Sequence, residues 1–151
     1  MKYKTFDEFE NFNFADTHIN DVEASLSTFK LGLDNVIIRS ENSKNKDIRD
    51  MRTNGLILSL KNASIVDFVR EGFKTYDADG NYLSDTEDEK VEEDEYKDVF
   101  DQFIDASVYL IDKNDDTYNF IIDANDERTY VITVTAESDV CEWDKFMNIE
   151  M

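Results

Sequence analysis

Residues 106–136, ASVYLIDKNDDTYNFIIDANDERTYVITVTA, are the stretch that decides the fold. Three segments in it are rich in β-branched and aromatic residues: ASVYLID (106–112), TYNFIID (117–123) and RTYVITVTA (128–136). The two sequences between them, KNDD and ANDE, consist of residues that favour turns. A repeat of about 10 residues with polar turns is typical of consecutive antiparallel strands. The sequence therefore predicts an antiparallel meander over residues 106–136.

Two earlier segments, residues 17–40 and residues 55–76, also have the character of strands. Apolar residues occupy every second position in parts of both, which is the period of a strand with one buried face. These residues are Phe29, Leu31 and Leu33 in the first segment, and Leu56, Leu58 and Leu60 in the second. We expect both segments to add strands to the sheet.

Three helices are predicted around these strands. The central one, at about residues 92–104, has apolar residues with helical spacing, which gives it an amphipathic face. They are Tyr96, Val99, Phe100, Phe103 and Ile104. Thr5 and Glu8 match a capping box that would begin a short helix near the N-terminus, and Asp139 and Glu142 suggest another before the C-terminus. The predicted fold class is α+β: an antiparallel meander sheet with one amphipathic helix and short terminal helices.

The composition indicates one acidic globular domain over residues 1–151. The chain has 36 acidic and 16 basic residues, a net charge of −20, and 40% hydrophobic residues that include eleven Phe and seven Tyr. That apolar content is too high for a disordered chain. The negative charge argues against nucleic acid and anionic membranes as partners, since both would repel it. The single cysteine and the lack of an apolar signal segment at the N-terminus favour a cytoplasmic location.

Residues 84–105 carry much of the negative charge, with eleven acidic residues and two lysines. A charge run of this kind is commonly a solvated surface. It can also be a docking surface for a basic protein, because complementary charge accelerates encounter and rejects wrong partners. The residues predicted to bind such a partner are Glu92, Glu93, Asp94, Glu95 and Asp98.

Residues 39–54 are the one locally basic stretch. Arg39, Lys44, Lys46, Arg49 and Arg52 outnumber the acidic residues there. We interpret the stretch as a mobile surface loop that partly neutralises the acidic surface, with a second contact site as the alternative.

The segment FKTYDADGNYLSD, residues 73–85, raises the question of a calcium loop. An EF-hand loop with Gly80 at its sixth position would place Thr75 at the first position and Thr86 at the twelfth. Both charged anchor ligands would then be missing. We therefore predict a hairpin turn around Gly80, and weak calcium binding is retained as an alternative.

Signatures of catalysis are sparse. His18 is the only histidine, and Asp16 could orient it if the backbone between them were extended. Cys141 and Trp143 are interpreted as packing residues. The sequence contains neither a phosphate-binding loop nor a dinucleotide-binding motif, and its one histidine and one cysteine are far apart, so no cofactor or metal is predicted.

Four segments resemble a group of small acidic bacterial proteins to which no function is assigned. They are FDEFENFNFADTHINDVEAS (6–25), LDNVIIRSENSKN (33–45), YDADGNYL (76–83) and CEWDKF (141–146). In size, acidity and expected fold the chain is also similar to the immunity proteins of bacterial toxin systems. Neither resemblance implies a role for any particular residue.

Two functional hypotheses follow. The first, which we favour, is a non-enzymatic module that binds a basic protein through its acidic face, with an immunity or antitoxin role as the specific version. The second is a metal-dependent or hydrolytic enzyme whose carboxylates, with Asp16 and His18, come together only in the folded chain.

Overall fold

The predicted meander is confirmed. In the computed structural model, which describes residues 1–149, β12 (Ser107–Asn114), β13 (Thr117–Asp123) and β14 (Thr129–Thr135) pair antiparallel in chain order. The side chains of β13 and β14 alternate between buried and more exposed positions, as the sequence pattern requires, and a β-bulge between Val108 and Leu110 interrupts this alternation in β12. The buried residues of β13 and β14 are Tyr118, Phe120, Ile122, Tyr130, Ile132 and Val134.

The meander belongs to a ten-stranded antiparallel sheet with the order β1-β15-β7-β4-β3-β12-β13-β14-β8-β11. The further strands are β1 (Tyr3–Phe6), β3 (Thr17–Ala24), β4 (Thr28–Asp34), β7 (Leu56–Lys61), β8 (Ser64–Arg70), β11 (Glu89–Lys90) and β15 (Ser138–Trp143). Both segments predicted to add strands do so, since β3 and β4 lie in residues 17–40, and β7 and β8 in residues 55–76.

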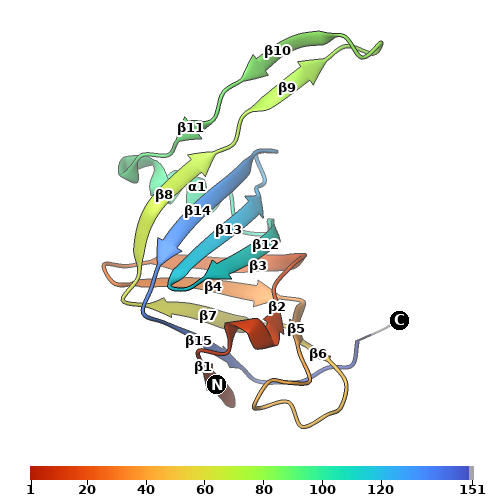
Figure 1. The fold of residues 1–151 in the computed structure, drawn as a ribbon, viewed down its shortest axis with the longest axis vertical. Coiled ribbons are helices and arrows are strands. Elements are labelled where there is room, and N and C mark those ends of the chain that lie inside the picture. The colour runs from red at the N-terminus through yellow and green to blue at the C-terminus, as the bar shows by residue number, and fades with distance from the viewer. Residues whose placement is uncertain (150–151) are drawn as a thin grey trace.

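The sheet bends over on itself at two corners. At Asn62–Ala63 the chain passes from β7 into β8, and at Ala136–Glu137 from β14 into β15. β7 pairs with β15 in one layer, and their continuations β8 and β14 pair with each other in the second layer. The two chain segments therefore stay side by side as they pass from one layer to the other. Figure 1 shows the result: β3, β4 and β7 run across the direction of β8, β14 and β13.

The apolar core lies between the two layers. Phe29 on β4 contacts Phe120 on β13, with ring centroids 5.2 Å apart, and Phe68 on β8 contacts Tyr130 on β14 at 6.1 Å. Trp143 on β15 is completely buried and meets Phe12 edge-on at 5.5 Å. This packing gives the sheet the hydrophobic interior that its alternating pattern predicted.

The α+β class was wrong, since strands take up 54% of the structure and helices only 8%. The helix expected over residues 92–104 is reduced to a 3-10 turn, η2 (Glu93–Glu95), followed by α1 (Tyr96–Asp101). α1 covers one opening of the core, where Phe100 lies 6.2 Å from Phe29 and 5.8 Å from Phe68. The apolar stripe was therefore identified correctly, but the helix ends at Asp101, and Asp105, with a φ of 70°, then turns the chain into β12.

Both terminal helices were also wrong. Thr5 lies in β1 with its side chain buried, so it is not a helix cap, and Glu8 instead binds Ser43. Only the 3-10 turn η1 (Phe9–Asn11) follows. Near the other end, Asp139 and Glu142 are part of β15. In both places strand pairing between β1 and β15 overrides the local helix signals.

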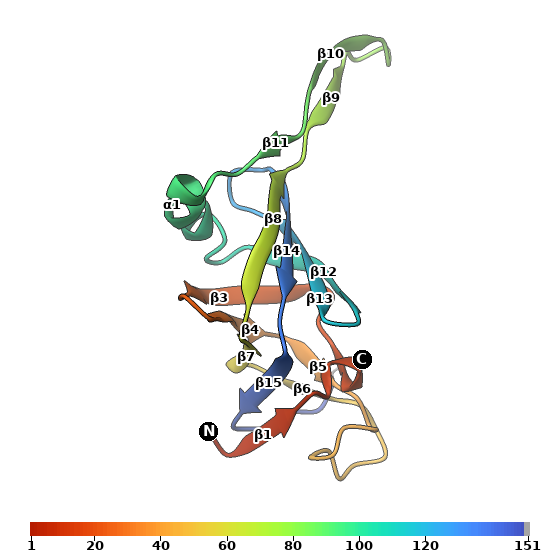
Figure 2. The same cartoon turned by 60° about the vertical axis from the view of Figure 1, so that its left-hand side comes forward.

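Two smaller sheets complete the fold. β2 (Phe12–Asn13), β5 (Val36–Ile38) and β6 (Met51–Thr53) form a three-stranded sheet at one end of the body. β9 (Phe73–Tyr76) and β10 (Tyr82–Thr86) form a two-stranded sheet at the other end. Figure 2 shows that β9 and β10 project well beyond the body as an arm.

Candidate functional site

The arm, residues 73–86, is an outward extension of the hairpin formed by β8 and β11. Arg70 pairs with Glu89 in that hairpin, and Phe73 pairs with Thr86 where the arm begins. β9 and β10 pair only with each other. The arm is therefore attached to the body at its root alone, and Figure 1 shows both of its faces clear of the other strands.

The root of the arm is built by close packing and specific contacts. A Cβ at Gly72 would collide with the carbonyl oxygen of Thr86, so only glycine allows the two chains to approach this closely. The Gly72 backbone N–H donates to Asp88 Oδ1 at 2.6 Å. The Arg128 guanidinium lies over the ring of Phe73, 5.0 Å from its centre. These contacts set the direction in which the arm leaves the body.

The tip of the arm is the turn predicted around Gly80, which has a φ of 85°. Asp77 organises it: its Oδ1 accepts hydrogen bonds from the backbone N–H groups of Asp79 at 2.9 Å and Asn81 at 2.8 Å. These bonds, the one from Asn81 first, lower the pKa of Asp77. The Asp77 carboxylate therefore stabilises the turn.

Large apolar side chains on the arm are exposed to solvent. Their exposed fractions are 50% for Phe73, 54% for Tyr76, 55% for Tyr82 and 59% for Leu83. Tyr76 and Tyr82 face each other across the strands, with ring centroids 6.2 Å apart in an edge-to-face arrangement. A β-bulge interrupts the pairing between Tyr82 and Ser84. The arm thus presents an aromatic surface that the body does not cover.

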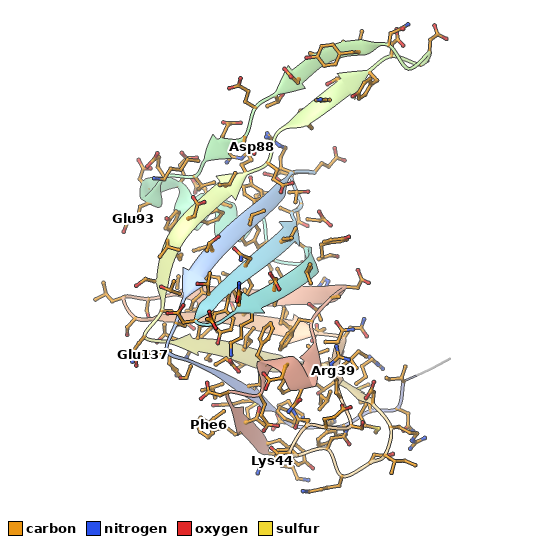
Figure 3. All side chains as sticks on the ribbon, viewed as in Figure 1. Phe6, Arg39, Lys44, Asp88, Glu93 and Glu137 are labelled. Atoms are coloured by element: carbon orange, nitrogen blue, oxygen red, sulfur yellow. The ribbon has the colours of Figure 1, made fainter. Side chains whose placement is uncertain are left out.

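The five predicted contact residues lie at the same end of the molecule as the arm. Glu92 precedes η2, the next three residues form η2, and Asp98 lies in α1. All are exposed except Glu95, which is partly buried. Figure 3 shows Glu93 pointing outward at the same end of the molecule as Asp88.

Two arginines tie this acidic segment to the body. Arg70 lies 3.6 Å from Glu89 and 3.8 Å from Glu95, and Arg128 lies 3.6 Å from Glu89. Arg70 also donates to the Tyr130 hydroxyl at 2.9 Å. Glu92, Glu93, Asp94 and Asp98 have no ion-pair partner within residues 1–149.

The negative charge also affects Tyr96. Partial burial of Tyr96 and, after it, the charges of Glu93 and Glu92 raise the pKa of its hydroxyl. This end of the molecule therefore carries an excess of free negative charge.

The sequence predicted the turn at Gly80 but not the arm. FKTY and YLSD have the residue types of ordinary strands, so the sequence did not show that these strands would be exposed rather than buried. One clue lay in the segments themselves, because the large apolar residues Phe73, Tyr76, Tyr82 and Leu83 are not spaced at every second position. Tyr76, Tyr82 and Leu83 are accordingly functional candidates that sequence reasoning missed.

His18 lies in β3 with an exposed side chain. Its Nε2 is 3.2 Å from Asp105 Oδ1, and both side chains are well exposed. Asp16 does not orient it, because Asp16 has a φ of 59° and the backbone there is not extended. Within residues 1–149, no group of three or more His, Cys, Asp or Glu side chains is arranged to hold a metal ion. Cys141 is buried, which raises the pKa of its thiol.

The basic stretch at residues 39–54 is held at the opposite end of the body. Asn45 is buried, and its side-chain amide donates to the carbonyl oxygens of Ile38, Arg39 and Arg49 at 3.1–3.2 Å. The Ser43 backbone N–H donates to Glu8 at 2.8 Å. The loop therefore has a defined shape that positions its lysines.

Comparisons add no relative to this picture. No protein-family model, no curated protein and no solved structure matches the chain. Among residues 1–149, no helix has the length and apolar character needed to cross a membrane.

Proposed function

We propose that this protein is a binding module that holds a basic protein partner between its arm and the acidic residues beside the arm's root. The observation that carries this proposal is the arm itself. It is a two-stranded hairpin outside the body, with Phe73, Tyr76, Tyr82 and Leu83 exposed on it.

An isolated two-stranded hairpin is marginally stable in water, and exposed apolar side chains add to its cost. A contiguous exposed apolar surface on a folded protein commonly marks a site of contact with another protein. Tyrosine is also enriched among the residues that dominate binding energy at interfaces. The Tyr76–Tyr82 pair is therefore the expected anchor of the interface.

The charge beside the arm indicates the chemistry of the partner. Within residues 1–149, Glu92, Glu93, Asp94 and Asp98 are free of ion pairs, and they lie at the same end of the molecule as the arm. A basic surface is attracted to such a cluster before contact, which raises the association rate and makes it dependent on salt. In this proposal the acidic residues raise the association rate, and the tyrosines slow the dissociation of the bound partner.

An immunity or antitoxin role is the specific version of this proposal. An acidic protein can neutralise a toxin that acts on nucleic acid by covering the basic surface with which that toxin holds its substrate. The projecting arm gives the module a part that can enter a concave site.

The test is an affinity capture from the native cell with the tagged protein, at low and at high salt, followed by binding measurements with the purified partner. We expect a stoichiometric basic protein whose association rate falls with salt. In the variant E92Q/E93Q/D94N/E95Q/D98N the association rate should fall about tenfold or more, whereas Y76S/Y82S should accelerate dissociation.

A matched variant provides the control. D21N/E23Q/E41Q/D112N/D115N removes the same charge from exposed positions elsewhere on the molecule. It should bind as the unaltered protein does. Equal losses in the two five-residue variants would show that net charge alone matters, and undiminished binding by Y76S/Y82S would contradict the role of the arm.

A further inference from the structure

A hollow of about 770 Å³ lies at the end of the body opposite the arm. Its wall on one side is the start of β1, and on the other side the loop of residues 44–47, with Phe146 between them. Four of the 16 basic residues of the chain border it, namely Lys2, Lys4, Lys44 and Lys46. In a protein with a net charge of −20, the hollow is thus a local basic site.

The lysine side chains in the hollow are only partly paired. Within residues 1–149, the Nζ atoms of Lys2 and Lys44 have no carboxylate within 4.0 Å, and Lys46 Nζ donates to a backbone carbonyl at 3.1 Å. Acidic groups are nevertheless close, because the Lys2 backbone N–H donates to Asp144 Oδ1 at 3.0 Å and the charge of Lys44 helps to lower the pKa of Glu8. In the same described range, only Lys4 among the four lysines forms an ion pair, with Glu142 at 3.4 Å. The one carboxylate in the lining, Asp47, is engaged by Arg49, whose guanidinium lies 3.0 Å away. The site therefore has cationic capacity left for a ligand.

The hollow runs along a free strand edge. β1 is the last strand of the ten-stranded sheet and, in the described part of the chain, residues 1–149, pairs with β15 alone. Successive residues of a strand point to opposite faces, yet Lys2, Tyr3 and Lys4 all border the hollow. The hollow must accordingly lie at the edge between the two faces. The Lys2 backbone N–H at this edge is already bonded to Asp144, so the outward-facing backbone groups of β1 itself, Tyr3–Phe6, are those that could pair with another strand.

The walls of the hollow are held by packing and hydrogen bonds. Tyr3 packs edge-on against Phe146 at 4.8 Å and stacks on the buried Trp143 at 5.7 Å. Asn45 and the Ser43–Glu8 contact hold the opposite loop in place. A ligand would therefore enter a preformed groove that has a free edge and cationic rims.

We propose that this groove binds an extended acidic peptide segment of another protein, which adds a strand to β1 and places its carboxylates against the four lysines. Strand addition supplies backbone hydrogen bonds, while the side chains that flank the strand supply specificity. Figure 3 shows Lys44 at the opposite end of the long axis from Asp88 and Glu93, so the site is separate from the acidic end and independent of the function proposed there.

The test uses a fluorescent octapeptide in which Glu alternates with Val, titrated with the full-length protein. We expect saturable binding, and chemical-shift changes of the backbone amides of residues 2–6. The K2Q/K4Q/K44Q/K46Q variant should weaken binding by about tenfold or more. The K61Q/K74Q/K90Q/K97Q variant, which changes the net charge equally at exposed positions elsewhere, should keep the original affinity.

Two further probes distinguish strand addition from non-specific electrostatic attraction. The same peptide with alternate backbone nitrogens methylated keeps its charge but cannot pair with β1, and it should lose binding. If it binds as well as the parent peptide, or if inorganic tripolyphosphate binds at the lysines with equal affinity, strand addition is refuted. Salt-sensitive self-association without peptide that disappears in the four-lysine variant would instead identify a second copy of this chain as the occupant, and would also overturn the proposal.

Discussion

Asp139 is a carboxylate that the fold buries almost completely, with 1% of its surface exposed. Its Oδ2 accepts a hydrogen bond from the Tyr118 hydroxyl at 2.7 Å and lies 3.4 Å from Lys113 Nζ. Burial, and then the bond to Asp139, raise the pKa of Tyr118 well above its ordinary value. The sequence suggested a helix cap at Asp139, because a local pattern does not reveal a partner 21 residues away.

Tyr118→Phe should destabilise the protein by about 1–3 kcal/mol, because a buried charged acceptor loses a hydrogen bond. Urea unfolding followed by tryptophan fluorescence would measure the loss. Tyr109→Phe is the control, since Tyr109 is 59% exposed and should change the free energy of unfolding by less than about 0.5 kcal/mol. Equal effects of the two substitutions would contradict the role of Asp139.

Glu8 gives the stability a dependence on pH. Partial burial alone would raise the pKa of Glu8, but hydrogen bonds from Ser43 and Asn11 outweigh it and lower the pKa below 4.5. A carboxyl with a lowered pKa in the folded state stabilises the protein above its unfolded pKa, and this stabilisation disappears as the pH falls through the folded pKa.

Glu8→Gln should therefore cost about 1–2 kcal/mol at neutral pH and progressively less below pH 4.5. The measurement is the difference in unfolding free energy between the two proteins across the acid range. Glu10→Gln, at an exposed neighbouring position, should show almost no difference at any pH. A cost that stays constant with pH would show that the Glu8 charge is irrelevant.

At the level of elements, the strands with alternating apolar residues were predictable, whereas β1 and β15 were mistaken for helices. Leu31, Leu33, Leu56 and Leu58 alternate in the sequence and are buried in neighbouring strands β4 and β7. The N-terminal helix signal failed because the partner of β1 is β15, more than 130 residues away, and a local pattern contains no information about it. The arm was not predicted for a similar reason: its strand pattern is real, but its lack of a covering layer is a property of the whole fold.

Gly72→Ala tests the root of the arm. Its methyl group must displace the chain at Thr86, so β9 and β10 should lose their fixed attachment while the body keeps its own packing. Hydrogen exchange should accelerate about tenfold or more for arm amides and stay unchanged for β13. Glu71→Ala is the neighbouring control. Accelerated exchange throughout β13 would show that the arm supports the body as well.

At the scale of the whole molecule, charge is divided between two ends. The acidic segment and the arm occupy one end of the long axis, and Lys44 lies at the other, as Figure 3 shows. The sequence indicated both charged segments but not that the fold would place them so far apart. That separation arises from the two corners at residues 62–63 and 136–137, where no sequence pattern indicates that a strand changes layers.

A net charge of −20 should make the folded state sensitive to salt. Raising the ionic strength from about 0.01 M to about 0.15 M shortens the Debye length from about 30 Å to about 8 Å and weakens the mutual repulsion of the carboxylates. We expect stabilisation by about 1 kcal/mol, or roughly 3 °C in Tm. Differential scanning calorimetry measures it, and the five-residue acidic variant should show a smaller rise. A Tm that falls with salt would mean that attractive ion pairs dominate.

The pairing of β1 with β15 also orders events in time while the chain is being made. Tyr3–Phe6 leaves the ribosome more than 130 residues before its neighbour in the sheet, Ser138–Trp143. β8 can pair early with β11 but gains its second neighbour only with β14, whereas β3, β4 and β7 can pair as soon as they appear. A nascent chain of this protein therefore carries an unpaired, lysine-bearing strand until β15 is released, and the sheet is completed only then.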